Sequence, residues 1–500
     1  MKQIYNNSPK IYVDGQIEAK VESPAMLPQV RWALVSLSLA TLLPALGTSI
    51  ASVSLPTLAQ TFNASFPQVQ WIVLAYLLAT TALVVSAGRL GDIFGRRRLL
   101  MSGLVVFTAA SILCGAAPTL WLLIAARAAQ GFGAAVMLSL SMALVGETVP
   151  KQKTGSAMGL LGTMSAIGTA LGPSLGGILI SELSWRSIFL INLPLGGLTF
   201  FLAYRYLPVE QGKKAREGER VRFDTLGTLV LALTLAGYAL AMTLGGGKFG
   251  VLNIAHLVAA LFGAGLFVLT EAKATSPLIK LAVFRNPLMS GGFATSTLVT
   301  TVLMATLVVG PFYLAYGLGL GSALIGLVMS VGPVVVALTG IPAGRLVDRL
   351  GAQRLTILGL VTIMVGAFGL TLIPFGFGIP GYLAPIAFIT FGYALFQTAN
   401  NTAVMKDVPS DRRGAISGLL NLSRNLGLIT GTSVMGALFA LASGTSEITE
   451  ASAEAVAGGM RITFAVAAGL ILVALIIANV SRSISHLQRN LLVIREQKEA

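Results

Sequence analysis

The sequence predicts an all-α membrane protein with fourteen transmembrane helices. Hydrophobic residues make up 55% of the chain and charged residues only 11%, against roughly 25% charged residues in an ordinary soluble domain. Apolar runs of about 20 residues, long enough to cross a bilayer, recur along the whole chain. Helices are expected rather than a β-barrel, because barrel strands are short and alternate between polar and apolar residues.

The apolar runs define the expected helices in order. The first six cover residues 31–55, 69–89, 99–117, 119–147, 154–180 and 186–207. Two more cover residues 224–244 and 252–271, and the last six cover 288–316, 323–345, 354–373, 381–405, 413–442 and 460–480. We therefore expect an N-terminal tail (1–30), a six-helix bundle (31–207), an inserted pair of helices with flanking loops (208–287), a second six-helix bundle (288–480) and a C-terminal tail (481–500).

Basic residues support this topology. With a cytoplasmic N-terminus, the even-numbered connections hold groups such as Arg96, Arg97 and Arg98, whereas the odd-numbered ones hold only Arg186, Lys248 and Arg461. This asymmetry follows the positive-inside rule and predicts that both termini are cytoplasmic. The net charge of +15 is then a consequence of topology. Nucleic-acid binding is not expected, because the basic residues are spread over every inner loop instead of one face.

Residues with metal or catalytic chemistry are sparse. Cys114, His256 and His486 are isolated along the chain, so we expect neither a metal site nor a cofactor. No nucleophile with a neighbouring base and no phosphate-binding loop is visible, which makes an enzyme or a sensor the least favoured class. The polar first 30 residues contain no short apolar region before a cleavage site, so no removable signal peptide is expected.

An internal repeat gives the architecture. The segment "GRLGDIFGRRR" at Gly88 returns as "GRLVDRLGAQR" at Gly344, an offset of 256 residues. A glycine-rich segment that begins at Val149 returns at Val408, an offset of 259 residues. The chain is therefore expected to contain two pseudo-symmetric six-helix bundles with two inserted helices, and paired halves in a membrane are typical of secondary transporters.

Several motifs resemble those of the major facilitator superfamily, in its fourteen-helix drug:proton antiporter branch. Besides the repeated loop segment, these are "RAAQGFGAA" from Arg127, "GTALGPSLGG" from Gly168, "WRSIFLINLPLG" from Trp185 and "RNLGLITGTSVMGAL" from Arg424. The resemblance covers essentially the whole chain and implies the major facilitator fold, a small-molecule substrate, protons as coupling ions and location in the cell inner membrane. A monomer in the lipid bilayer is expected.

The loop motif is interpreted as a conformational latch. Its members are Gly88, Asp92, Gly95, Arg96 and, in the repeat, Asp348. The glycines permit a tight turn, and a carboxylate beside a helix N-terminus is favourable by about 0.3–1 kcal/mol. By resemblance, the partner of Asp92 lies near Gly414 at the start of the thirteenth helix. The alternative, a positive topology anchor, is favoured for the three consecutive arginines.

The motif of the fifth helix contains Gly168, Gly172, Pro173, Gly176 and Gly177. Glycines four residues apart allow two membrane helices to approach closely, and Pro173 removes a backbone hydrogen bond. By resemblance, this motif is linked to antiport. Close packing without a role in transport direction is the alternative.

Arg127 and Glu147 are the candidates for proton coupling, by resemblance alone. A charge near the centre of a bilayer costs about 2.5–3.5 kcal/mol on insertion scales, so Arg127 is expected to point into the bundle towards a partner. Snorkelling to the outer surface is the alternative. The two residues cannot pair, because twenty residues of helix separate them by about 30 Å.

The sequence also departs from the drug antiporter pattern. Members of this branch typically carry an Asp in the first helix where this chain has Gly47, and no acidic residue falls in the middle of an apolar run. The expected substrate cavity offers Gln70, Tyr76, Gln130, Tyr313, Gln397, Asn400, Asn421 and Arg424. Such a lining suits a neutral or anionic amphiphile, although polar side chains also hold membrane helices together.

Two functions follow. The first is proton-coupled export of amphipathic small molecules across the inner membrane, favoured by the intact "GPSLGG" segment. The second is a dedicated transporter of one neutral or anionic metabolite, such as a vitamin like riboflavin, a siderophore or a natural product, favoured by Gly47.

Overall fold

The computed structural model describes residues 28–149, 154–208, 225–244, 250–274, 281–372, 374–405, 408, 413–444 and 447–499. Within these ranges the chain is helical, and fourteen helices are long and apolar enough to cross a membrane. The expected all-α fold with fourteen membrane helices is therefore confirmed. Of the expected tails, the N-terminal one lies almost wholly outside the described residues.

The helices of the first half and of the insertion follow the expected order. They are α1 (Pro28–Val53), α2 (Leu55–Thr61), α3 (Phe66–Phe94), α4 (Arg96–Ala116), α5 (Leu120–Thr148), α6 (Thr154–Glu182), α7 (Ser187–Leu190), α8 (Asn192–Tyr206), α9 (Thr225–Thr243) and α10 (Val251–Lys273). The short α2 and α7 lie in the connections after α1 and α6, so each membrane crossing keeps its place in the predicted series.

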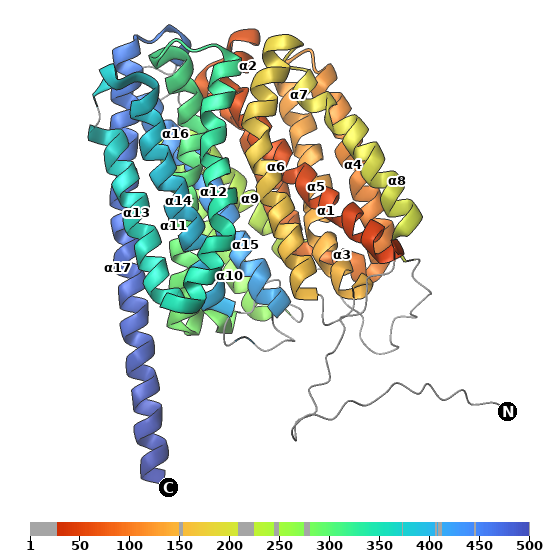
Figure 1. Cartoon of the computed structure of the whole chain (residues 1–500), viewed down its shortest axis with the longest axis vertical. Coiled ribbons are helices and arrows are strands. Elements are labelled where there is room, and N and C mark those ends of the chain that lie inside the picture. Colours follow the sequence, from red (N-terminus) through yellow and green to blue (C-terminus); the bar gives the residue numbers. More distant parts are fainter. Residues whose placement is uncertain are drawn as a thin grey trace, which may run out of the picture.

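The second half has two helical irregularities that the sequence did not predict. Its elements are η2 (Leu281–Arg285), α11 (Pro287–Phe312), η3 (Tyr313–Gly317), α12 (Ser322–Leu350), α13 (Ala352–Leu372), η4 (Phe375–Phe377), α14 (Gly378–Met405), α15 (Arg413–Thr430), η5 (Gly431–Met435), α16 (Gly436–Ala442), η6 (Ile448–Glu450) and α17 (Ala453–Glu499). The segments η3 and η5 are π-helical turns. Helix α17 also continues far beyond residue 480, through the residues expected to form a tail (Figure 1).

The two halves repeat the same helix packing (Figure 1). In the first half α1 packs on α6 and α8, while α5 packs on α3 and α4. In the second half α11 packs on α15 and α17, while α14 packs on α12 and α13. Each pair in one half thus has its counterpart in the other, as the sequence repeat predicts.

Glycine contacts repeat with the sequence as well. A Cβ at Gly133 would lie 2.7 Å from the carbonyl oxygen of Gly103, and a Cβ at Gly392 would lie 2.6 Å from that of Gly359. These pairs are related by the offsets of 256 and 259 residues already seen in the sequence. The repeat is therefore a repeat of backbone-to-backbone contacts between neighbouring helices.

The inserted helix α9 is hydrogen-bonded to both halves. Ser86 and Thr228 share a hydrogen bond of 2.7 Å between their hydroxyl oxygens, and Trp71 donates its indole N–H to Thr243 at 3.1 Å. Both contacts join α9 to α3 of the first half. Tyr238 donates to Thr430 of α15 at 3.1 Å and so joins α9 to the second half. Helix α10, by contrast, packs on α9 and is largely exposed.

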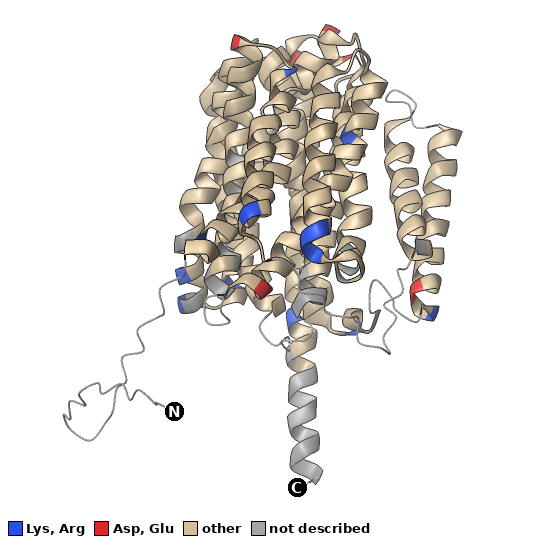
Figure 2. Cartoon of the chain, turned by 90° about the vertical axis from the view of Figure 1, so that its right-hand side faces the viewer, with Lys and Arg blue, Asp and Glu red and all other residues tan. Residues whose placement is uncertain are grey.

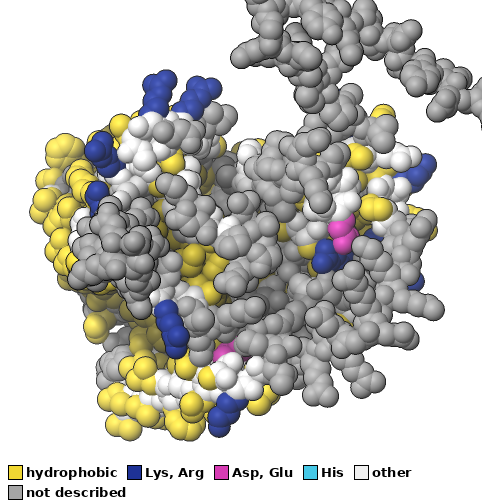
Figure 3. All heavy atoms as spheres, turned by 90° about the horizontal axis from the view of Figure 1, so that it is seen from below, with side chains coloured by type: hydrophobic (Ala, Val, Ile, Leu, Met, Phe, Trp, Pro, Cys, Tyr) yellow, Lys and Arg dark blue, Asp and Glu magenta, His cyan; other side chains and the backbone are white. Residues whose placement is uncertain are grey.

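The two ends of the bundle differ in charge. Arginines and lysines concentrate at the end where α17 leaves the bundle (Figure 2), which we call the basic end. The described residues there include Arg96, Arg97, Arg98, Lys273, Arg285, Arg345, Arg349 and Arg354. Seen from that end, basic side chains stand at separate points of the face, while hydrophobic side chains lie along part of its outer edge and in a patch near its middle (Figure 3). The other end is called the opposite end below.

The two halves meet closely at the opposite end. A Cβ at Gly177 of α6 would lie 2.6 Å from the carbonyl oxygen of Ser322 and 2.9 Å from Cα of Gly326, both in α12. The ring of Phe66 packs edge-on against Phe312, with centroids 4.6 Å apart, and against Phe439 at 5.4 Å. At the basic end, a Cβ at Gly344 or Gly418 would meet no atom within 4 Å in the part of the chain that is described. The halves are thus joined at the opposite end.

We expect Gly326→Val to open the opposite end, because even a Cβ would overlap the carbonyl oxygen of Pro173. The measurement is maleimide labelling of a cysteine at Thr432, which is fully buried and is bound by Gln70 of the first half, in a chain whose only cysteine, Cys114, is replaced by alanine. The rate should rise about tenfold, which corresponds to a population shift of roughly 1.4 kcal/mol.

The matched control is Gly197→Val on the exposed face of α8, where a Cβ would meet no atom within 4 Å. Equal labelling rates in the two variants would show that the glycine contact does not hold the halves together.

Candidate functional site

The loop motif forms the turn between α3 and α4. Helix α3 ends at Phe94, Gly95 has a φ of 92°, and α4 begins at Arg96. Gly351, the counterpart of Gly95, has a φ of 83° between α12 and α13. Both positions lie in the region of φ that favours glycine. The side chains of Asp92 and Asp348 lie outside the described part of the structure, as does the expected partner near Gly414, so the latch stays a prediction.

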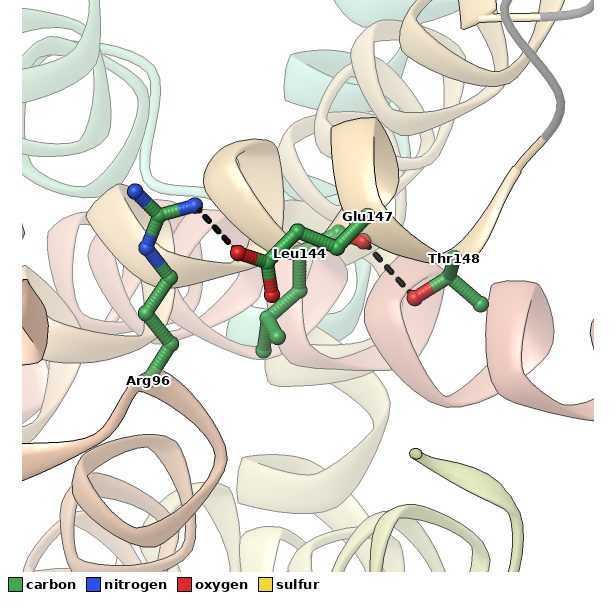
Figure 4. Close-up of polar contacts among 4 residues, drawn as sticks. All are labelled: Arg96, Leu144, Glu147 and Thr148. Carbon is green, nitrogen blue, oxygen red and sulfur yellow. Dashed lines mark hydrogen bonds and ion pairs between the residues drawn. The ribbon is translucent and has the colours of Figure 1, made fainter. Parts of the chain in front are cut away.

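One latch residue and one coupling candidate form an ion pair. Arg96 Nη1 lies 2.9 Å from Glu147 Oε1 (Figure 4). The two side chains are 30% and 42% exposed, and a pair this accessible contributes about 0–1 kcal/mol. Glu147 therefore joins the end of α5 to the start of α4 at the basic end.

Arg127 lies fully buried inside the first half. Its Nε donates to the carbonyl oxygen of Ile72 at 2.9 Å, and its Nη1 donates to Gln130, which in turn donates to Ser111 at 2.6 Å. The guanidinium also lies 4.3 Å from the ring centroid of Tyr76. The predicted inward orientation is thus observed, and all these partners are electrically neutral.

Gly47, the position at which the sequence comparison expected an Asp, lies beside this cluster. A Cβ at Gly47 would lie 4.0 Å from Arg127 Nη1 and 3.6 Å from the ring of Phe107. Arg127 Nη2 is buried with no hydrogen-bond partner among the described residues. Gly47 therefore leaves vacant a position from which a carboxylate would reach the guanidinium.

The glycines of the fifth-helix motif, which lies in α6, take part in two different helix contacts. A Cβ at Gly168 would lie 2.5 Å from the carbonyl oxygen of Leu42, while Gly172 and Gly176 face Ile50 of the same helix, α1. This part of the motif packs the first half internally. Gly177 and the carbonyl oxygen of Pro173 instead face Gly326 of the second half.

Gln70 crosses to the second half at the opposite end. Its side-chain amide donates to the carbonyl oxygen of Thr432 at 2.7 Å. Thr432 lies in the π-helical turn η5, where the ladder of main-chain hydrogen bonds departs from the α-helical pattern. A Cβ at Gly436 would overlap the Gln70 amide nitrogen. The segment "TGTSVMG" thus supplies both an accessible carbonyl and the space for the amide that binds it.

The other expected cavity residues lie in separate places. Tyr76 and Gln130 belong to the Arg127 cluster, and Tyr76 donates its hydroxyl to the carbonyl oxygen of Pro44 at 3.0 Å. Tyr313 stacks on Tyr382 with ring centroids 5.8 Å apart. Asn400 donates to the carbonyl oxygen of Gly292 at 3.1 Å and holds α14 against α11.

A second polar cluster lies between α14 and α15. Gln397 donates to Asn401 at 3.3 Å, and Arg424 Nη2 lies 3.5 Å from the Tyr393 hydroxyl oxygen. Asn421 and Arg424 are both half-buried. Three residues of these contacts, Tyr393, Gly326 and Gly436, were not identified from the sequence. Tyr393 could have been found, because it precedes Gln397 and Asn401 at a spacing of four residues.

Acidic side chains are confined to helix ends. Within the described helices, each Asp or Glu lies in a first or last turn, as Glu147, Glu182 and Glu271 do. Among the same residues, no three His, Cys, Asp or Glu side chains gather into a group that could hold a metal ion. The interior of the described bundle therefore carries arginine charge without a carboxylate beside it.

Comparison with known proteins gives consistent matches. Residues 37–432 match the family model of the Major Facilitator Superfamily. The chain is 33% identical to the multidrug resistance protein Stp of Mycobacterium tuberculosis, over 78% of this chain and 72% of that protein. It is 31% identical to the riboflavin transporter RibZ of Clostridioides difficile, over 81% of this chain and 88% of that protein.

A solved structure is similar over nearly the whole chain. It is a bacterial homolog of the human lysosomal transporter Spinster in an inward-facing, unoccupied conformation, with a TM-score of 0.66 and 14% sequence identity. The similarity covers 93% of this chain and 98% of that one, and it supports the fold.

We expect Gly47→Asp to stabilise the protein by giving Arg127 the counter-charge it lacks. The reference is Gly47→Asn, which has the same shape without the charge. In the native background the Asp variant should exceed the Asn variant by about 1–3 kcal/mol in free energy of unfolding, and in an Arg127→Gln background the difference should vanish. Thermal unfolding of the four purified proteins measures this coupling. Equal stability of Asp and Asn beside the native Arg127 would mean that residue 47 does not reach the guanidinium.

Proposed function

The chain belongs to the major facilitator superfamily and is a membrane-spanning transporter, and we propose that it exports amphipathic small molecules across the cell inner membrane by proton antiport. The observation that carries this proposal is the contact of Gly177 and the Pro173 carbonyl oxygen with Gly326. It joins the two halves through the motif that, by resemblance, accompanies antiport. The multidrug resistance protein Stp, at 33% identity, supports export as well.

In this proposal the basic end faces the cytoplasm. The positive-inside rule supports this orientation, because basic residues concentrate at the end where α17 leaves the bundle. Both termini then lie in the cytoplasm, and the structure corresponds to a state closed towards the outside. Transport requires the halves to part at the Gly177–Gly326 contact and to approach each other at the basic end, where Asp92 would act as the latch.

Proton coupling is proposed from the family, with Arg127 and Glu147 as its candidate residues. Arg127 is held by neutral groups, and no carboxylate among the described residues is paired with it to exchange a proton. Glu147 carries a titratable group but is paired with Arg96 at the basic end. Coupling in this chain therefore differs from a scheme in which a carboxylate of the first helix carries the proton.

The alternative function is a dedicated transporter of one neutral or anionic metabolite. The combination of Gly47 with an Arg127 that has only neutral partners among the described residues favours it, because the acidic side chains of the described helices lie in first or last turns, where they do not face a lipophilic cation in the middle of the bundle. The 31% identity to the riboflavin transporter RibZ supports a vitamin as one candidate. In either case the protein is proposed to work as a monomer in the bilayer.

We predict that Asp92→Asn lowers transport about tenfold without loss of the protein from the membrane, since the substitution removes the charge that would bind the second half. Transport and the amount of membrane-inserted protein are measured together. The control is Arg98→Gln, which removes an exposed charge of the neighbouring arginine group and should change transport less than twofold. Loss of insertion in the Asp92 variant would instead favour the topology anchor.

The test of the proposed function is substrate-dependent proton release in inverted vesicles, read as a change in lumenal pH. Cationic dyes, neutral antibiotics and organic anions including riboflavin are added in turn. Release on adding several unrelated compounds is expected for a polyspecific exporter. A response to one compound alone supports the dedicated carrier, and substrate movement without any proton release would contradict proton antiport.

A further inference from the structure

The polar cluster between α14 and α15 has the composition of a binding site. Tyr393, Gln397 and Asn401 are spaced four residues apart and so lie on one face of α14. Arg424 of α15 lies beside this stripe, with its Nη2 atom 3.5 Å from the Tyr393 hydroxyl oxygen. Together these side chains offer a cation, a phenol and two amides.

Arg424 is a half-buried charge that has no counter-ion among the residues that the structure describes. In the described part of the chain, the guanidinium has one hydrogen bond, the long one to Tyr393. It lies on α15 about 11 residues after Arg413, or roughly 16 Å along the helix axis. A cation at such a depth usually has a partner or points into a water-filled cavity. Since no described carboxylate is paired with Arg424, an anion from solution is the group that would neutralise its charge.

The backbone around Arg424 is held in place by α11. Thr297 donates to the carbonyl oxygen of Ser423 at 3.0 Å, and Thr300 donates to that of Arg424 at 3.2 Å. Gly427 makes this approach possible, because a Cβ there would lie 2.4 Å or closer to atoms of these two threonines. The guanidinium therefore projects from a fixed point of the helix, as a binding group requires.

Two other arginines within membrane helices are less suitable than Arg424 for binding an anion from solution. Arg127 is fully buried and bound to Ile72 and Gln130. Arg461 lies about two turns from the start of α17, at the opposite end, where the halves are joined. Arg424 is instead on the basic-end side of α15, a helix that packs on α3 of the other half. A ligand between the two halves would thus meet Arg424.

Gln397 adds a second requirement to the ligand. Its amide nitrogen binds Asn401, while its Oε1 is buried and has no hydrogen-bond partner among the described residues. An unsatisfied buried acceptor costs about 1–3 kcal/mol, which a ligand that brings a donor would recover. The site therefore combines a donor for an anion with an acceptor for an N–H or O–H group.

We propose that Arg424, Tyr393 and Gln397 bind the head group of an anionic amphiphile that carries a carboxylate next to an N–H or O–H donor. The carboxylate accepts hydrogen bonds from the guanidinium and from Tyr393, and the donor binds Gln397 Oε1. This inference rests on the proposed function and names the substrate class of the same transporter. It assigns recognition to the second half alone.

Binding to the purified, full-length protein tests the inference with three matched probes. N-octanoylglycine has the carboxylate and the N–H, N-octanoylsarcosine has the carboxylate with a methyl in place of the N–H hydrogen, and N-octanoylglycine methyl ester has the N–H without the charge. Affinity is measured by isothermal titration calorimetry, because all four tryptophans lie in the first half of the chain. We expect N-octanoylglycine to bind at least about tenfold more tightly than either analogue, the effect of one charged or one buried hydrogen bond.

The variants separate the two contacts. Arg424→Gln should abolish the preference for the acid over the ester, while Arg424→Lys should retain part of it. Gln397→Leu should abolish only the preference for glycine over sarcosine. The control Arg461→Gln, a half-buried arginine of the same half, should leave both preferences unchanged.

Thermal unfolding of each variant identifies any that fails to fold, in which case Arg424→Lys carries the comparison. Absence of binding by N-octanoylglycine, equal affinity for the acid and its ester, or a preference that survives Arg424→Gln would overturn the proposal. Because binding is measured without a proton gradient, failure of proton antiport in vesicles would leave this result independent.

Discussion

The close backbone contact between α6 and α12 is the constraint on which the arrangement of the halves depends. Main chains can approach to this distance only where no Cβ intervenes, so Gly177 and Gly326 must both be glycine. The Phe66 ring cluster and the hydrogen bond from Gln70 to Thr432 also join the two halves. Each of these interactions is individually modest, at about 1 kcal/mol for the hydrogen bond. Together they determine which end of the molecule is joined.

The balance of charge inside the bundle is a second constraint. Removing one partner of a buried ion pair usually costs about 3–5 kcal/mol, because the other charge stays unpaired. Arg127 avoids part of this cost through a carbonyl, an amide and an aromatic face. This cluster is internal to the first half and fully buried. It stabilises the half, whereas the half-buried Arg424 has one long hydrogen bond, to Tyr393, among the described residues.

Much of the fold could be predicted from the sequence because lipid imposes a simple pattern. All fourteen membrane helices and the two-fold repeat were predicted, since each needs an apolar run and since the glycine contacts recur with fixed offsets. The π-helical turns at Tyr313 and Gly431 were not predicted, because a change of main-chain hydrogen-bonding pattern over one turn does not alter the periodicity of the apolar residues. The continuation of α17 beyond residue 480 was also missed, since a polar segment carries no membrane signal.

The candidate site was only partly predictable for a related reason. Sequence motifs identified residues by type but could not tell which neighbour each one faces. Tyr76 and Gln130 were expected beside a substrate and instead bind within the Arg127 cluster. Gly177 and Gly176 are adjacent in one motif, yet they face different halves because neighbouring residues on a helix point about 100° apart.

The inserted helix α9 is attached mainly to the first half. It has hydrogen bonds to α3 near both of its ends and one hydrogen bond to α15 of the second half. A motion of one half against the other that keeps α9 on α3 has then to break the hydrogen bond between Tyr238 and Thr430 and the packing of Phe267 of α10 against the second half.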